Sequence, residues 1–386
     1  MSDRSKTREK GFSLLEMIVA MALGTIVLGA AVQIYSQGVS ATWTVSQRAE
    51  LQQDFRAASN MLTRDLSLAG AGLTPPGAAI QLPTSGTLPV YGCAQVSGTP
   101  CYLGTGNATS ASYPVQGSTP YLYGLLPGYD AGPTLNGLST DVVTVVYTDS
   151  AFFLDCYTAT VTASTTVTFT NPLQSNPSCT ANGSTIQNIN DSSVGLTAGD
   201  LVFFTFGSTS VVAAINGTAT SSTTATFATG DVLKMNQAST SPKSLASIAA
   251  GTTGTGTRIL VITYYVDKTV TPSRLMRQVS GHPPMPVAEN VVYMKFTYDL
   301  YNDSSDPAAP AVGCQNPGAA GDVCVSGSSS GLLPNQITKI NIAHMSMNGT
   351  LKGSLFGLGN GYQGLDLETS VSARDLTYNN EYPISP

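Results

Sequence analysis

The chain has 386 residues, enough for one large or two ordinary domains that each bury a core. Charged residues make up only 10% of the sequence, against a usual share of roughly a quarter, and Ser, Thr, Asn and Gly fill the polar positions. The net charge is −6, and Lys and Arg do not cluster beyond the first ten residues. This distribution argues against a dedicated nucleic-acid groove, so no direct nucleic-acid binding is expected.

The N-terminus combines a short basic stretch with a long apolar one. Residues 1–11, MSDRSKTREKG, hold four basic and two acidic side chains, and no charged residue occurs between Met17 and Gln47. The apolar stretch reaches the roughly 20 residues that span a bilayer, and the basic side predicts a cytoplasmic N-terminus and an exported body. A secretory signal peptide fits poorly, because this segment runs on into an amphipathic helix without a small-residue cleavage site.

Glu16 places a carboxylate inside this apolar segment, where a charge is costly and marks a candidate functional site. The sequence GFSLLE at residues 11–16 resembles the processing site of type IV prepilins. The resemblance implies that a membrane peptidase, which is also an N-methyltransferase, cuts after Gly11 and methylates Phe12. It also implies that Glu16 pairs with the amine of Phe12 in its own or a neighbouring subunit and thereby sets the register of assembly.

After the apolar run, the hydrophobic residues recur with the period of a half-buried helix. The apolar positions recur at three- and four-residue spacing: Leu51, Phe55, Ala58, Leu62, Leu66 and Ala69. Gly70, Gly72 and the following prolines end the pattern. We therefore predict one helix over residues 13–69, about 85 Å long at about 1.5 Å per residue, whose second half docks a globular body.

The rest of the chain predicts a β-rich body. Residues 73–140 are rich in Gly, Pro, Ser, Thr and Tyr and are interpreted as a long loop region. Enrichment in β-branched and aromatic residues predicts a first group of strands at 141–148, 151–161, 165–170, 200–206 and 211–215. A second group, predicted as an antiparallel meander, lies at 258–266, 274–279, 290–301 and 336–347. Ser/Thr/Gly tracts at 216–229 and 239–257 separate the groups and are candidate flexible or glycan-bearing insertions.

The second group extends the resemblance. The helix tail QQDFRAASNMLTRDLSLAGAG and the succession ITYYVD, RLMRQV and VAENVVYMKFTYDLYND are similar to PilW-like minor pilins and the related J-type pseudopilins of type II secretion. The resemblance implies an α+β, pilin-like fold. A long N-terminal transmembrane and amphipathic helix would pack on an antiparallel β-sheet domain with long loop insertions.

The implied organisation is a cleaved leader at 1–11, a helix at 12–72 and an exported β-rich domain at 73–386. The implied function is that of a minor pilin, not an enzyme, which supports assembly of a type IV pilus and hence motility, adhesion or DNA uptake. Its partners would be other pilin subunits, contacted through the helix, the prepilin peptidase and the inner-membrane assembly platform. It would wait in the inner membrane with its body in the periplasm, and then enter the surface pilus.

Two alternatives stay open: a pseudopilin of a type II secretion system, and a membrane-tethered exported hydrolase or binding protein. The hydrolase has little support. GSSSG at 327–331 fits a nucleophile-elbow pattern but lacks a preceding strand, and GNGYQG at 359–364 lacks the setting of a dinucleotide site. His282 and His344 have no catalytic constellation around them in the sequence.

The cysteines form three sequence-local couples, Cys93/Cys101, Cys156/Cys179 and Cys314/Cys324. Such couples among turn-forming residues suit disulfides in an oxidising compartment, although six cysteines allow other pairings. Zinc is disfavoured, because no C-x₂-C pair occurs and only two histidines are present.

No cofactor is expected, apart from a weak candidate calcium site. Four residues of one acidic stretch could supply its oxygen ligands: Asp299, Asn302, Asp303 and Asp306. The stretch does not match the EF-hand pattern, and a solvated turn is favoured instead. The tyrosines at positions 113, 121, 123 and 129 are interpreted as packing of the loop region onto the sheet, with an adhesive face as the alternative.

Overall fold

The structure is a computed structural model of the whole chain. It describes residues 11–73, 79–84, 89–91, 111–116, 118–172, 179, 189–216, 223–238, 240–301, 311–317, 321–328, 330–349, 363–373 and 376. The chain divides into two compact units. The first contains Met1–Gln53 and Gly349–Gln363, and the second contains Asp54–Asn348 and Gly364–Pro386, which we call the body.

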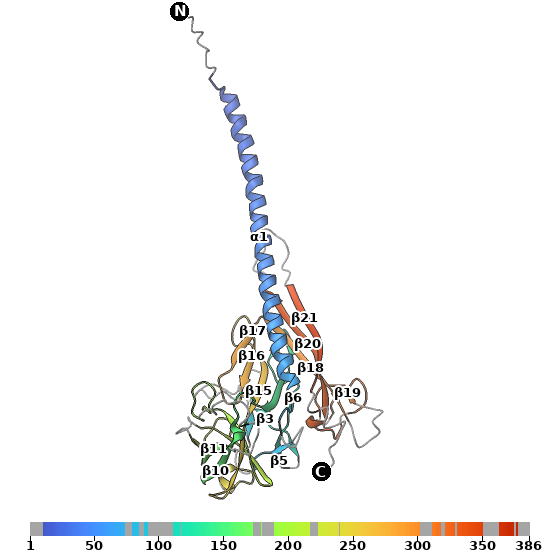
Figure 1. Cartoon of the computed structure of the whole chain (residues 1–386). Helices are drawn as coiled ribbons and strands as arrows, with labels where there is room; N and C mark the ends of the chain where they lie inside the picture. The colour runs from blue at the N-terminus through green and yellow to red at the C-terminus, as the bar shows by residue number, and fades with distance from the viewer. Residues whose placement is uncertain are drawn as a thin grey trace, which may run out of the picture. The chain divides into compact units, whose positions relative to one another are not determined.

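One helix, α1 (Leu14–Ser67), begins close to the predicted residue and ends two residues before the predicted one (Figure 1). Ser13 caps it: its hydroxyl accepts a hydrogen bond from the Leu15 N–H at 3.3 Å, and its carbonyl accepts from the N–H groups of Glu16 and Met17. The apolar run of α1 in the first unit exposes large side chains, such as Leu28 at 65% and Ile34 at 71%, whereas Leu51 near the end of that unit is 5% exposed.

The last turns of α1 belong to the body and bury the predicted stripe. Ala58, Leu62, Leu66 and Ala69 have no exposed surface, whereas Phe55 is half-buried. The chain leaves the helix through Gly70, whose φ of +82° is a conformation that glycine adopts without strain. The Gly70 N–H donates to the Val146 carbonyl at 2.8 Å and so ties the end of the helix to the sheet.

The body contains a ten-stranded antiparallel sheet built around one long strand, β15 (Thr253–Asp267). The N-terminal half of β15 pairs with β12 and β10, and its C-terminal half pairs with β9 and β16. The other strands of this sheet are β6 (Leu125–Gly128), β9 (Val142–Thr148), β10 (Tyr157–Ala163), β11 (Thr166–Pro172), β12 (Leu201–Phe206), β13 (Thr209–Ala214), β14 (Thr224–Thr226), β16 (Arg274–Val279) and β17 (Met285–Glu289).

A second, four-stranded sheet has the order β19-β18-β20-β21. Its strands are β18 (Val291–Leu300), β19 (Ala311–Cys314), β20 (Ile337–Gly349) and β21 (Gln363–Ser372). Smaller ladders join β1 (Ile80–Gln81), β4 (Val115–Gln116) and β5 (Thr119–Leu122), β2 (Val90–Tyr91) with β3 (Ala111–Ser112), and β7 (Thr134–Leu135) with β8 (Leu138–Ser139). Short 3₁₀ turns lie at Leu154–Cys156, Leu245–Ser247 and Pro334–Gln336.

The long helix followed by antiparallel sheets confirms the predicted α+β, pilin-like fold class. The interpretation of residues 73–140 as a loop region is wrong in part, because β5 and β6 form there and β6 joins the main sheet. Both strands have only four residues and include a proline, which leaves too short a run for alternation to be visible.

The two strand groups are also not separate. The start of β15 lies in the tract at 239–257 and pairs with β10 and β12 of the first group, and β14 forms within the tract at 216–229. The expected single meander splits after β17, where Asn290 has a φ of +63° and the next strand enters the second sheet. The segment 151–161 is a 3₁₀ turn before it becomes β10.

Candidate functional site

The N-terminal candidate residues lie at the exposed start of α1. Phe12 is 86% exposed, and Glu16 occupies the first helical turn with its side chain in the open. Within the described residues no hydrogen bond or ion pair involves the Glu16 carboxylate. Its place in the first turn suits a negative charge, because the helix N-terminus carries a partial positive charge. A full counter-charge for Glu16 would have to come from outside the described part of this chain.

The helix itself is suited to a bilayer by length and composition. It includes an 18-residue stretch that is apolar enough to cross a membrane, and none of that stretch is buried in the structure. An apolar surface of this extent is unfavourable in water at about 25 cal/mol per Å². A bilayer around the helix would remove that surface from water.

A second acidic residue of α1 has the opposite environment. Asp65 lies in the last turn and its side chain is only 4% exposed. Tyr264 of β15 donates its hydroxyl to Asp65 Oδ2 at 2.7 Å, and Tyr147 of β9 donates to Oδ1 at 3.1 Å. Arg277 of β16 completes the set with its Nε–H, which donates to Oδ2 at 2.8 Å. One carboxylate of the helix thus binds three adjacent strands, and we call these four residues the Asp65 anchor.

The charge of Asp65 and the burial of the anchor shift the pKa values of the residues that bind Asp65. Burial, and then the negative charge of Asp65, raise the pKa of Tyr147 to about 12 and that of Tyr264 further above its ordinary value. Burial acts to lower the pKa of Arg277, but the hydrogen bond and charge of Asp65 outweigh it and raise that pKa. Both phenols therefore stay protonated donors and the guanidinium stays charged at neutral pH.

A second buried carboxylate joins the two sheets. Asp141, directly before β9, accepts hydrogen bonds from Lys295 Nζ at 2.7 Å and from the Phe296 N–H at 2.9 Å, both on β18. Lys295 also pairs with Asp130 and lies over the ring of Tyr129. Burial raises the pKa of Asp141, although its hydrogen bonds to Lys295 and Phe296 lower it in part. The link holds the four-stranded sheet to the main one.

His282 lies in a turn, within a cluster of charged residues that the sequence did not predict. Its Nε2 lies 2.8 Å from Asp200 Oδ1, and Asp200 Oδ2 lies 3.7 Å from Arg258 Nη1. Arg258 also donates to Asp149 and to the carbonyls of Val194 and Gly195. Thr197 donates its hydroxyl to Asp200 Oδ2 at 3.3 Å, and among the described residues no hydroxyl or thiol forms a hydrogen bond with the His282 ring itself. The cluster holds neighbouring turns of the body together.

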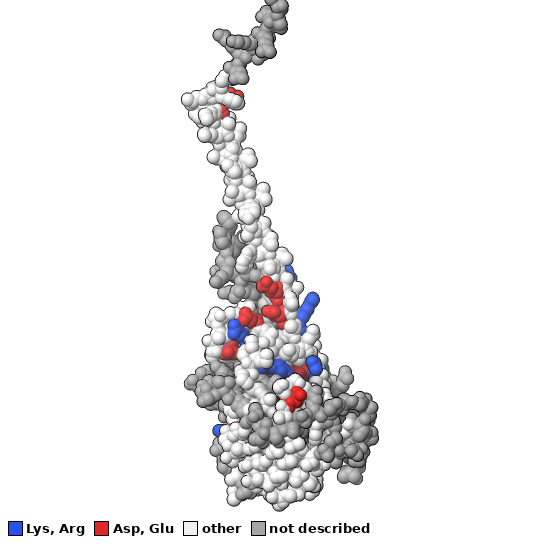
Figure 2. Space-filling view, turned by 60° about the vertical axis from the view of Figure 1, so that its left-hand side comes forward, with Lys and Arg blue, Asp and Glu red and all other residues white. Residues whose placement is uncertain are grey.

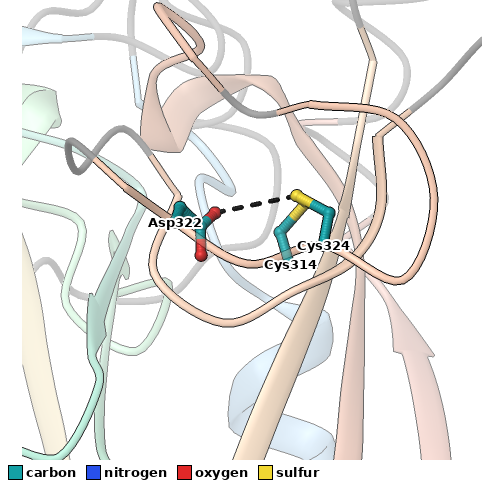
Figure 3. A group of neighbouring side chains, drawn as sticks. All are labelled: Cys314, Asp322 and Cys324. Atoms are coloured by element: carbon teal, nitrogen blue, oxygen red, sulfur yellow. Dashed lines mark hydrogen bonds between the residues drawn. A yellow bond between two sulfur atoms is a disulfide. The ribbon is translucent and has the colours of Figure 1, made fainter.

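The cysteines of two local couples are bonded in the structure. Cys156 pairs with Cys179, and Cys314 pairs with Cys324. Cys93 and Cys101 lie outside the described residues, so their pairing stays a prediction. Asp322 lies beside the second bridge (Figure 3), which brings three metal-ligating residue types together. Both sulfurs are consumed by the disulfide and carry no proton, and the Asp322 carboxylate accepts from the N–H groups of Gln315 and Asn316 instead.

Of the calcium candidates, only Asp299 is described, while Asn302, Asp303 and Asp306 lie outside the described residues. Asp299 Oδ1 accepts from the Gly313 N–H at 2.9 Å and from Asn341 Nδ2 at 3.1 Å, and Oδ2 lies 3.6 Å from Lys339 Nζ. This carboxylate therefore already has protein partners on both oxygens.

The remaining candidates are distributed as follows. Tyr113 and Tyr123 are buried, Tyr121 is half-buried and Tyr129 is 38% exposed, which agrees with packing rather than with a common exposed face. His344 lies on β20, opposite Lys295 of β18 in the strand register. GSSSG lies only partly within the described residues, and most of GNGYQG lies outside them.

The sequence analysis did not predict the Asp65 anchor. A signal was present, because Asp65 follows Leu62 by three residues and Ala58 by seven, which places it on the buried stripe of the helix. A carboxylate on such a stripe requires a partner, and its identity could not be read without the strand pairing that brings Arg277 beside Tyr264.

Comparison with known proteins adds one finding. Residues 6–32 match the family described as the prokaryotic N-terminal methylation motif, the class signal of type IV pilins and pseudopilins, which a prepilin peptidase processes. The match contains Gly11, Phe12, Glu16 and the first turns of α1. No curated protein and no solved structure matches the chain significantly.

Proposed function

We propose that the protein is a minor pilin of a type IV pilus. Residues 1–11 are removed as a leader, Phe12 is methylated, residues 12–72 pack among the helices of neighbouring subunits, and residues 73–386 form the exported body. The observation that carries the proposal is the set Gly11, Phe12 and Glu16, which lies within the methylation motif at the exposed start of an apolar helix.

The exposed half of α1 supports this role. Before assembly a bilayer covers its apolar side chains, and within a filament the same side chains pack against other helices. Glu16 then lies in an apolar environment, where a carboxylate needs a cation. The N-terminal amine of a neighbouring subunit supplies one. A misplaced subunit leaves the charge unpaired, so the pair enforces axial register.

The Asp65 anchor gives the buried half of α1 a complementary role. A subunit contributes to a filament only if its body stays fastened to the helix that the filament holds. Three strands bind one carboxylate on the last helical turn, and the apolar stripe packs around it. The helix packs into the filament, and the anchor keeps the body attached to the helix. Such a function is structural and requires no catalytic residue.

The test is Glu16→Ala in the full-length protein, with Glu50→Ala as the matched control because Glu50 is an exposed acidic residue of the same helix beyond the apolar run. We expect normal leader removal for both variants, normal amounts of Glu50→Ala in sheared filaments, and a loss of Glu16→Ala from that fraction by about tenfold or more, since an unpaired charge there costs several kcal/mol. Normal incorporation of Glu16→Ala would overturn the assigned role.

The same fractionation separates the pilus from a secretion pseudopilus. A pilus subunit is recovered from sheared surface filaments, and its deletion impairs motility, adhesion or DNA uptake. A pseudopilin stays with the envelope, and its deletion impairs export of secreted proteins. We place this protein in the pilus because its large, hydroxyl-rich body suits a surface filament better than a piston confined to the periplasm.

A further inference from the structure

One part of the main sheet, formed by β10, β11 and β14, presents a face rich in threonine. Threonine recurs at alternate positions of these strands, whose sequences are YTATVTA, TVTFTNP and TAT, with Pro172 as the exception at the end of β11. We define the threonine face by Thr158, Thr160, Thr166, Thr168, Thr170 and Thr226. All six side chains are exposed or half-buried.

The threonines are aligned across the strands. In the register Thr158 lies opposite Thr170, Thr160 opposite Thr168, and Thr166 opposite Thr226. Rows therefore repeat at about 4.8 Å across the strands and about 6.7 Å along them. Hydroxyl and methyl groups recur together along these rows, up to a register shift between Val161 and Ala163 that places Thr166 opposite Ala163 on the β10 side.

The threonine face is backed by buried apolar side chains of the same strands. The alternate residues of the same strands, including Val161, Val167 and Phe169, are at most 1% exposed and belong to one apolar core. Threonine is a good strand former, and proteins often place charged residues, Lys above all, on exposed edge strands. These three strands contain neither. In the view of Figure 2 the lower end of the body, where Figure 1 labels β10 and β11, is free of Lys, Arg, Asp and Glu.

The chemistry of the face excludes several partners. Nucleic acids and anionic lipid surfaces require cations, which these strands lack. A protein hot spot is typically built on Trp, Tyr or Arg, and a small ligand needs a concave pocket. The aromatic residues of these strands, Tyr157 and Phe169, point into the core. What remains is an extended, uncharged surface that itself presents regularly spaced hydroxyl groups.

We infer that the threonine face binds the flat surface of an insoluble neutral polysaccharide, such as cellulose or chitin. Each threonine carries a hydroxyl, which can donate and accept, and a methyl, which can pack against the carbon-bound hydrogens of a sugar ring. The hydroxyls of Thr168 and Thr170 also make long hydrogen bonds of 3.5 Å within the hairpin, to Thr162 Oγ1 and the Thr158 carbonyl. Single contacts are weak, and many aligned contacts on one rigid face add up through multivalency. The threonine face belongs to the body, so this binding does not depend on whether the protein enters a pilus or a pseudopilus.

The experiment is depletion of the purified full-length protein, in mild detergent, by suspended cellulose and chitin particles. We expect retention on at least one of them that is insensitive to added salt, because no charge takes part. Thr160→Val/Thr168→Val keeps the shape and strand preference but removes two hydroxyls, so retention should fall about tenfold or more. Thr168→Lys should abolish it, and Thr134→Val on β7, outside the face, should bind normally.

Three outcomes would overturn the inference: no retention on either solid, equal retention of the double variant, or retention that salt removes. Adsorption to ice crystals without binding to either polysaccharide would equally reject it and assign the array to ordered water. The assay does not depend on processing of the N-terminus. A negative result here and a failure of the Glu16 test are therefore independent.

Discussion

Glu16 and Asp65 are two carboxylates of one helix with opposite surroundings. Asp65 is buried and has three donors from β9, β15 and β16, whereas Glu16 is exposed and the described part of the chain offers its side chain no partner. The contrast separates a carboxylate that holds this fold together from one whose partner belongs to the proposed assembly. The charge of Asp65 is satisfied within the chain, and we propose that Glu16 takes its counter-charge from a neighbouring subunit.

The largest effect that would test this contrast is expected from Asp65→Ala. The change leaves the partly buried Arg277 and the hydroxyl of Tyr264 without their common acceptor, and it should lower the free energy of unfolding by about 3–5 kcal/mol. Urea unfolding of the full-length protein in detergent measures it. Asp54→Ala, at an exposed position of the same helix, is the control and should unfold like the parent. Equal urea midpoints for the parent, Asp65→Ala and Asp54→Ala would show that the contacts of Asp65 do not stabilise the fold.

Alkaline pH should weaken the anchor in a defined range. The pKa of Tyr147 is raised to about 12 in the folded state from its ordinary value of 10.0. Its contribution is fully present below pH 10 and is lost as the pH rises from 10 to about 12, because the unfolded phenol ionises first. The loss is about 3 kcal/mol at most.

We therefore expect Tyr147→Phe to be less sensitive than the parent between pH 10 and 12 when unfolding is followed at each pH. The exposed Tyr35 of α1 provides the control, since Tyr35→Phe should keep the full alkaline loss. If the Tyr147→Phe profile stayed parallel to the parent profile, the phenol would not be coupled to folding.

A smaller effect is expected where the two sheets meet. Lys295→Met removes the cation beside Asp141, whose side chain is 2% exposed, but the Phe296 and Asp130 N–H groups still donate to it. We expect a loss of about 2 kcal/mol in the free energy of unfolding. Lys339→Met, at a side chain that is 47% exposed, should change little. A larger loss for Lys339→Met than for Lys295→Met would contradict the assigned link.

The sequence was most informative where one periodicity persisted. The continuous apolar run and the stripe from Leu51 to Ala69 predicted the long helix, and the β-branched runs predicted the strands near β9, β12, β15 and β18. Short strands that contain proline, such as β5 and β6, gave no such signal. The N-terminal set was readable because its residues are adjacent in the chain, whereas Asp65 and Arg277 are 212 residues apart.

Gly11 and Phe12 are the proposed processing site. Mass spectrometry of the N-terminal peptide, from membrane and sheared-filament fractions with and without the prepilin peptidase, tests it most directly. The account predicts a terminus at methylated Phe12 that depends on the peptidase and is present in the sheared filaments. An intact Met1 terminus, or a cut after the apolar run, would contradict it.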